Sequence, residues 1–284
     1  MGGDIKIDLP IGDLVTMVCC VVKSTVRPPA VAGSFYPSER GELARVVDGL
    51  LAAAPQVVGP CPKVLIVPHA GYVYSGPIAA SAFARIAPHA DRIERVVLVG
   101  PAHRVAVDGL VGPGAAWLAT PLGELEVDVA AIAGVPELGA NVAAHAREHS
   151  LEVELPFLQR VAPRAKLVPL VVGRARPDEV GRVLDALWGG PETLIVISSD
   201  LSHYEPYRIG REHDERTVAR ILDGDTSLAG TDACGAAALN GLAWLARTKR
   251  LRLELIDLRS SGDTAGSRDE VVGYGAFVGH EVRA

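Results

Sequence analysis

The chain has few of the features that would point to a nucleic-acid partner. Only 5% of its 284 residues are aromatic, and no stretch concentrates Lys and Arg beside aromatic side chains. The formal net charge is −6, so the chain as a whole repels a polyanion. We therefore expect no nucleic acid to bind.

Long hydrophobic runs are also missing. The apolar segment 14–22 is only nine residues long, whereas a helix needs about 20 residues to span a bilayer. Acidic residues precede this segment, where a signal peptide would carry positive charge. We expect no membrane contact. We interpret residues 1–26 as an N-terminal extension, either an appended strand or a poorly ordered segment, in front of one domain over residues 27–284.

Cysteine is scarce. The four cysteines show no paired spacing, and a chain of this size needs no disulfides. This usage favours a reduced, cytoplasmic setting. The adjacent Cys19 and Cys20 are a conceivable redox pair, but the sequence around them lacks the positive charge that activates a thiol.

Several catalytic motifs are absent as well. The sequence contains no G-x-S-x-G elbow, so Ser198, Asp200 and His203 do not form a convincing hydrolase triad. It contains no phosphate-binding Walker loop, and the glycine spacing in 273–279 is wrong for a dinucleotide-binding fingerprint. These absences remove the commonest hydrolase, nucleotide and dinucleotide classes.

The chain does contain short apolar runs that alternate with helical stretches. This alternation predicts an α/β fold, with one central, mostly parallel or mixed sheet flanked by helices. Region 105–147 is ambiguous, because 117–128 reads as a hairpin and 129–146 as either a helix or a loop. The expected strands are 63–67, 94–99, 166–172, 193–198, 251–258 and 271–279, and the expected helices are about 39–54, 76–87, 148–161, 177–188, 209–223 and 232–247.

Three of the apolar runs end in a histidine within a few residues. His69 follows the run 63–67, His103 follows 94–99, and His203 follows 193–198 together with Asp200. Ligands of open α/β sheets bind beyond the carboxyl ends of the strands. Three imidazoles at one rim therefore predict a metal or proton-transfer site.

Cys234 is a candidate fourth member of this site. We expect it in the first turn of the helix 232–247, with Thr231 or Asp232 as the cap. Exposed amide groups and the helix dipole would there lower the pKa of the thiol. A thiolate opposite two histidines is a credible metal ligand.

The segment HAREH (145–149) matches the H-x-x-E-H pattern of inverted zinc proteases. If it is helical, His145 and His149 share one face. The other interpretation is that Glu148 and His149 begin the next helix and place His149 near the strand ends, as an acid/base or supporting group.

Six motifs in the same order together resemble the Memo family, the system B component of the AMMECR1–Memo–radical SAM gene trio. They span nearly the whole chain from about 28 to 279. The resemblance implies the fold of class III extradiol (LigB-like) dioxygenases, which cleave aromatic rings with non-haem Fe(II). The motifs are PHAGYVYSG, VGPAH, TPLGELEVD, EHSLEVELPFLQ, SSDLSHY and DACGAAA.

The resemblance also implies roles for individual residues. His69 and His103 match the two iron-binding histidines, and Cys234 stands where the dioxygenases have a glutamate. His203 matches the acid/base histidine, and His149 a second active-site histidine. Asp200 is a Memo-type residue near the same pocket, and we add it and Glu148 to the catalytic candidates.

The thiolate departs from the two-histidine, one-carboxylate set that suits Fe(II) in ring-cleaving dioxygenases, because a thiolate is a softer ligand that favours Cu(I), zinc or a more electron-rich iron. We expect Fe²⁺, with copper or zinc as alternatives, and a redox or oxygenase-type reaction on a small molecule. The rival is a non-enzymatic module that binds a peptide or a protein. The resemblance implies an AMMECR1-like or a radical SAM protein as the partner. A third hypothesis is hydrolysis at a zinc site.

Overall fold

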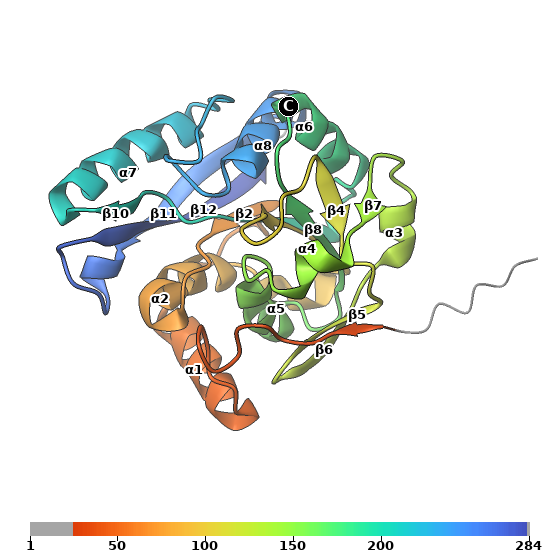
Figure 1. The fold of residues 1–284 in the computed structure, drawn as a ribbon, viewed down its shortest axis with the longest axis horizontal. Coiled ribbons are helices and arrows are strands. Elements are labelled where there is room, and N and C mark those ends of the chain that lie inside the picture. Colours follow the sequence, from red (N-terminus) through yellow and green to blue (C-terminus); the bar gives the residue numbers. More distant parts are fainter. Residues whose placement is uncertain (1–24, 283–284) are drawn as a thin grey trace, which may run out of the picture.

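The computed structural model describes residues 25–282, and a nine-stranded mixed sheet forms the centre of this region (Figure 1). The strand order is β10-β12-β2-β9-β3-β8-β4-β7, with β11 paired to β12. The strands are β2 Val64–Val67, β3 Arg95–Pro101, β4 Leu110–Gly112, β7 Gly139–Ala140, β8 Lys166–Val172, β9 Thr193–Ser198, β10 His203–Glu205, β11 Leu251–Ser260 and β12 Val271–Glu281.

The middle of this sheet is parallel. Strands β2, β9, β3 and β8 run side by side in one direction, while β12 and β4 join antiparallel at either flank. These four parallel strands are almost wholly buried, as expected for apolar runs covered on both faces. The α/β fold with a mixed central sheet is confirmed.

Helices cover both faces of the sheet (Figure 1). Helices α1, α2 and α5 pack in one hydrophobic core, and α6, α7 and α8 pack in a second core on the opposite face. Alternate residues of β2 pack in the two cores. Leu65 and Val67 belong to the first core, and Val64 and Ile66 belong to the second. The helices are α1 Arg40–Ala53, α2 Tyr72–Phe83, α5 Leu155–Val161, α6 Pro177–Ala186, α7 Tyr207–Leu222 and α8 Ala236–Lys249.

The ambiguous region contains the predicted hairpin. Strands β5 (Trp117–Thr120) and β6 (Gly123–Glu126) pair antiparallel, and β1 (Val26–Arg27) adds a third strand. The region 129–146 is neither one helix nor one loop. It holds the short helices α3 (Val129–Ala133) and α4 (Val142–Ala146) with β7 between them.

Several predicted helix boundaries are wrong, and the shifts matter for the site. Helix α1 begins at Arg40 and is capped by the Glu39 carboxylate. Helix α2 begins at Tyr72, before Pro77, because its buried apolar face continues through the proline. Helix α8 begins only at Ala236, so Cys234 lies before the helix and not in its first turn.

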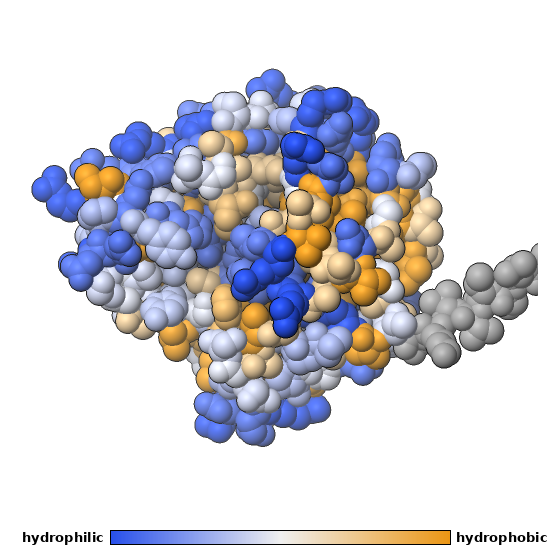
Figure 2. Space-filling view, in the orientation of Figure 1, coloured by the Kyte–Doolittle hydropathy of each residue, from blue (hydrophilic) through white to orange (hydrophobic). Residues whose placement is uncertain are grey.

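The proposed extension over residues 1–26, including the pair Cys19–Cys20, lies almost entirely outside the described residues, and the boundary at 26/27 stays a prediction. Within residues 25–282, no helix has both the length and the apolar character needed to cross a membrane. On the face seen in Figure 2, the α7 side of the molecule is mainly hydrophilic, and apolar groups gather over α3 and α4, where Val129 and Val142 are exposed.

Candidate metal centre

The carboxyl ends of three adjacent parallel strands carry the predicted site. His69, His103 and Asp200 each lie two residues beyond the last residue of β2, β3 and β9. The register keeps these ends together, because β9 pairs with β2 on one side and β3 on the other. Strand topology therefore converts three distant sequence motifs into one cluster.

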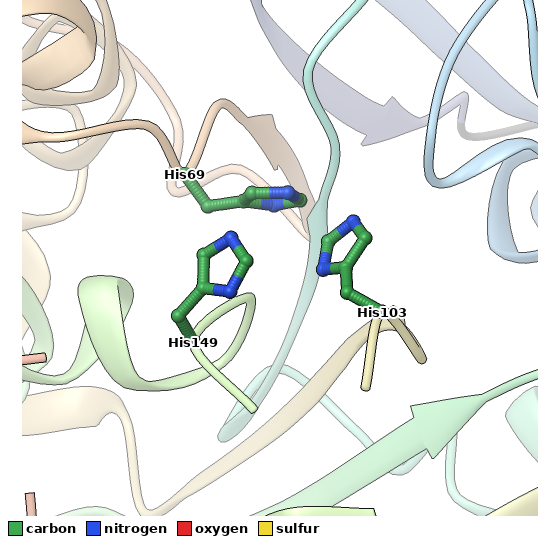
Figure 3. A group of neighbouring side chains, drawn as sticks. All are labelled: His69, His103 and His149. Carbon is green, nitrogen blue, oxygen red and sulfur yellow. The ribbon is translucent and has the colours of Figure 1, made fainter. Parts of the chain in front are cut away.

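Three imidazoles face one another at this rim (Figure 3). Each of His69, His103 and His149 offers a ring nitrogen, and these nitrogens lie within 4.8 Å of one another. The ring centroids of His103 and His149 are 4.7 Å apart, and His69 lies 5.3 and 5.6 Å from them. Nitrogens this close could bind a single ion.

In two of the three rings, the other nitrogen already has a polar side-chain partner. Nδ1 of His69 lies 2.7 Å from Oγ of Ser198, and Nδ1 of His103 lies 2.9 Å from a carboxylate oxygen of Glu148. Metal-binding histidines typically donate their other ring N–H to such oxygens, which fixes the tautomer and the ring orientation. Both rings are thus prepared to present Nε2 to an ion.

His149 lacks this kind of support. It comes from the loop between α4 and the 3-10 helix η2 (Glu152–Glu154), and its Nδ1 is buried without a hydrogen-bond partner among the described residues. A carboxylate oxygen of Glu148 lies 3.4 Å away, but not in hydrogen-bond geometry. An orphaned buried nitrogen beside two oriented imidazoles fits a metal site better than a purely structural one.

The Glu148 carboxylate orders the loop that carries this cluster. It accepts hydrogen bonds from the backbone N–H of His103 at 2.6 Å, of His149 at 2.9 Å and of Ser150 at 3.0 Å. Burial opposes the charge, but hydrogen bonds from His103 and Ser150 lower the pKa of Glu148 to about 2. These contacts are those of a positioning residue, and its catalytic role stays a prediction.

Two of the three histidines, His69 and His149, are held in their neutral form. Burial lowers the pKa of His149 to about 4, and the nearby His103 adds to this shift. Burial and the same neighbour lower the pKa of His69 far below its ordinary value. Neutral imidazole is the form that binds a metal, so these two rings need lose no proton at pH 7.

Cys234 lies on the other side of His69. Its Sγ is 3.4 Å from Nε2 of His69 and 3.2 Å from the backbone N–H of Asp200, which donates to it. The predicted low pKa of the thiol is wrong, because burial and the charge of Asp200 raise it to about 12. Cys234 precedes α8 and lies outside its first turn, and burial outweighs the hydrogen bonds that the backbone N–H groups of Asp200 and Gly235 donate to the sulfur.

Asp200 and His203 flank the same pocket. Oδ1 of Asp200 accepts a hydrogen bond of 2.8 Å from the backbone N–H of His69, and burial raises the pKa of this carboxyl to about 6. Nδ1 of His203 lies 2.9 Å from the carbonyl oxygen of Leu201. A ring that donates through Nδ1 keeps Nε2 free to accept a proton.

The predicted site residues other than Glu148 line a cavity of about 530 Å³. Five further side chains of this cavity were not predicted as site residues, and apart from Tyr204, which ends the SSDLSHY motif, nothing in their local pattern marks them. One of them, Tyr204, is 72% exposed and has a φ of +57°, a conformation that is rare outside glycine and is found at functional sites. The five are Arg104, Tyr204, Glu205, His213 and Thr231, the last of which was expected only as a helix cap.

The H-x-x-E-H interpretation fails on geometry. Helix α4 ends at Ala146, so His145 and His149 do not share a helical face. His145 is buried and its Nε2 lies 2.9 Å from the carbonyl oxygen of Val111. This histidine supports the fold, and it lies outside the three-histidine cluster.

The fold and the site together define an α/β protein with a histidine cluster at the carboxyl ends of its parallel strands. The model of the Memo-like protein family matches residues 27–278. The chain belongs to the Memo family. Relatives named MEMO1 family protein come from Aquifex aeolicus (38% identical over 272 residues, 88% of this chain and 97% of the relative), Ignicoccus hospitalis (35% over 280, 88% and 97%) and Methanosarcina mazei (35% over 277, 89% and 98%).

Proposed function

We propose that the protein binds one iron(II) ion through His69 and His103 and uses it in a redox or oxygenase-type reaction on a small molecule. The observation that carries this proposal is the three-histidine cluster, whose ring nitrogens lie within 4.8 Å of one another. The Nδ1 contacts of His69 and His103 support it, since both rings are already oriented.

Two side chains compete for the third ligand position. His149 belongs to the compact cluster, whereas Cys234 lies 3.4 Å from the nitrogen that His69 would offer. A three-nitrogen set suits iron, copper or zinc alike, and a thiolate shifts the preference toward softer ions such as Cu(I) or zinc. The choice of third ligand therefore bears directly on the identity of the metal.

The chain's own groups supply the rest of the chemistry. A bound iron(II) ion would supply a redox-active centre with open positions for small ligands. We assign the proton transfers to His203, whose Nε2 is free when Nδ1 donates to Leu201. Asp200 holds the backbone of His69 and lies beside the thiol of Cys234, so it orients both flanks of the site.

Metal analysis of untagged protein tests the proposal. Protein reconstituted with iron(II) without oxygen and then desalted should retain about one ion per chain. His69→Ala and His103→Ala should lose it, and His89→Ala is a matched control because His89 lies in the 3-10 helix η1 (Ala87–Arg92), which precedes β3, whereas His103 follows the other end of that strand. Equal metal content in all four proteins would overturn the proposal.

Oxygen uptake separates catalysis from binding alone. The iron-loaded protein should consume oxygen with some member of a panel of small aromatic and carbonyl compounds, and His203→Gln should slow this step. Retention of iron without uptake, together with stoichiometric capture of a peptide or of an AMMECR1-like or radical SAM protein, would instead favour a binding module.

A further inference from the structure

A second buried glutamate lies behind His69. Glu154 ends η2, is fully buried, and has one carboxyl oxygen, Oε1, 2.9 Å from Oγ of Ser198. Its other oxygen is buried without a hydrogen-bond partner, and no Lys, Arg or His pairs with it within residues 25–282. An ionised carboxylate in such a place would be strongly destabilising.

The hydroxyl of Ser198 has more polar neighbours than it has protons. Its Oγ lies 2.6 Å from the carbonyl oxygen of Ser150, 2.7 Å from Nδ1 of His69 and 2.9 Å from Oε1 of Glu154. A serine hydroxyl has one proton and two lone pairs. The carbonyl can only accept, and it is the nearest of the three, so Ser198 donates to it.

The other two neighbours must then donate to Ser198. His69 does so through an Nδ1–H, which leaves the lone pair of Nε2 facing the cluster. Glu154 does so only if its carboxyl carries a proton. If Glu154 were ionised, Ser198 could satisfy only one of two acceptors, and two oxygens would face each other without a proton between them.

We infer that Glu154 is a positioning residue, a neutral carboxylic acid that donates to Ser198 and thereby locks the Nδ1–H tautomer of His69. Burial also raises the pKa of Glu154 well above its ordinary value, in agreement with this assignment. The tautomer follows from hydrogen-bond geometry alone, whereas its consequence for the metal rests on the proposed function.

This assignment gives the two oriented histidines partners of different charge. His103 donates to an ionised carboxylate, that of Glu148, whereas His69 donates to a neutral hydroxyl backed by a neutral acid. An imidazole whose N–H donates to a carboxylate is a more basic metal ligand than one whose N–H donates to a neutral group. Glu154 therefore keeps one negative charge out of the site while still fixing the ring.

Infrared spectroscopy on protein with ¹³C-labelled glutamate tests the protonation directly. At pH 8 the wild type should show the carbonyl band of a protonated acid, and Glu154→Gln should remove it. Glu148→Gln is the matched control, because Glu148 is equally buried but only accepts hydrogen bonds, and it should leave the band in place. A band that survives in Glu154→Gln, or is absent from the wild type, overturns the inference.

Iron(II) affinity measured on folded variants tests the positioning role. A glutamine amide can donate to Ser198 as the acid does, so Glu154→Gln should bind iron as the wild type does, whereas Glu154→Leu should bind about tenfold more weakly. Equal loss in both variants would overturn the inference. If the wild type binds no iron, the infrared result and the ¹⁵N shifts of the His69 ring still decide the tautomer, so failure of the two proposals is distinguishable.

Discussion

The thiol of Cys234 lies 3.4 Å from Nε2 of His69, although the two residues are 165 positions apart in the chain. Burial raises the pKa of this thiol to about 12, so it is protonated in the metal-free protein at neutral pH. A thiol must lose its proton to bind a metal, whereas the neutral imidazole of His149 need not. The number of protons released therefore identifies the third ligand.

Calorimetric titration with iron(II) in two buffers of different ionisation enthalpy measures this number. If Cys234 is a ligand, the wild type should release about one proton per ion and Cys234→Ala none. His149→Ala serves as the comparison, because its removal should leave the proton count unchanged. No release from the wild type would assign the third position to His149.

Glu148 should matter for metal affinity without touching the ion. It accepts from both the ring and the backbone of His103, so Glu148→Gln weakens the support of one ligand. Loss of such outer contacts typically lowers metal affinity about 10- to 100-fold. Competition with a fluorescent chelator measures the change. Glu126→Gln is the control, because Glu126 is half-buried and pairs with Lys166 instead of a site residue, and equal affinities of the two variants would contradict the role of Glu148.

Gly235 should be essential for the placement of Cys234. A Cβ at this position would lie 2.5 Å from Cβ of Ser199 and 3.0 Å from the carbonyl oxygen of Ser198. Gly235→Ala should therefore lower the free energy of unfolding by about 1–3 kcal/mol. Urea denaturation measures this. Gly230→Ala, in the same loop with nothing within 4 Å of the added Cβ, should be nearly neutral, and similar losses in both would contradict the steric argument.

His145 should make the fold sensitive to acid. Burial lowers its pKa from 6.5 to about 4, so below pH 6.5 the unfolded chain takes up a proton that the folded protein excludes. The contribution of neutral His145 to the free energy of unfolding is fully present above pH 6.5. It is lost, by about 3 kcal/mol, as the pH drops to about 4. Melting temperatures across this range should fall less steeply for His145→Gln than for the wild type. If the melting temperatures of the two proteins fell equally steeply with pH, another group would be responsible for the loss of stability.

The positions of three site residues could be predicted because each residue lies just beyond the carboxyl end of a strand that the sequence reveals. Each buried run (64–67, 95–101 and 193–198) is recognisable by its apolar side chains, and the rim beyond parallel strands is shared by topology. His69, His103 and Asp200 therefore meet without any contact having to be known in advance.

The remaining site residues depend on tertiary contacts that local patterns do not encode. His149 lies in a loop fixed by the Glu148 carboxylate, not in the helix that its sequence suggests. Glu154 sits among apolar residues and resembles an ordinary helix-start acid, yet it is buried against Ser198, 44 positions away. The surroundings of Cys234 were predicted wrongly because α8 starts two residues after it.

We expect one metal ion to lie among His69, His103 and either His149 or Cys234. Anomalous diffraction from a crystal of iron-loaded protein, collected on both sides of the iron absorption edge, locates this ion. A single strong peak should appear about 2 Å from the Nε2 atoms of His69 and His103. A peak elsewhere on the protein, or none at this rim despite iron in the crystal, would contradict this expectation.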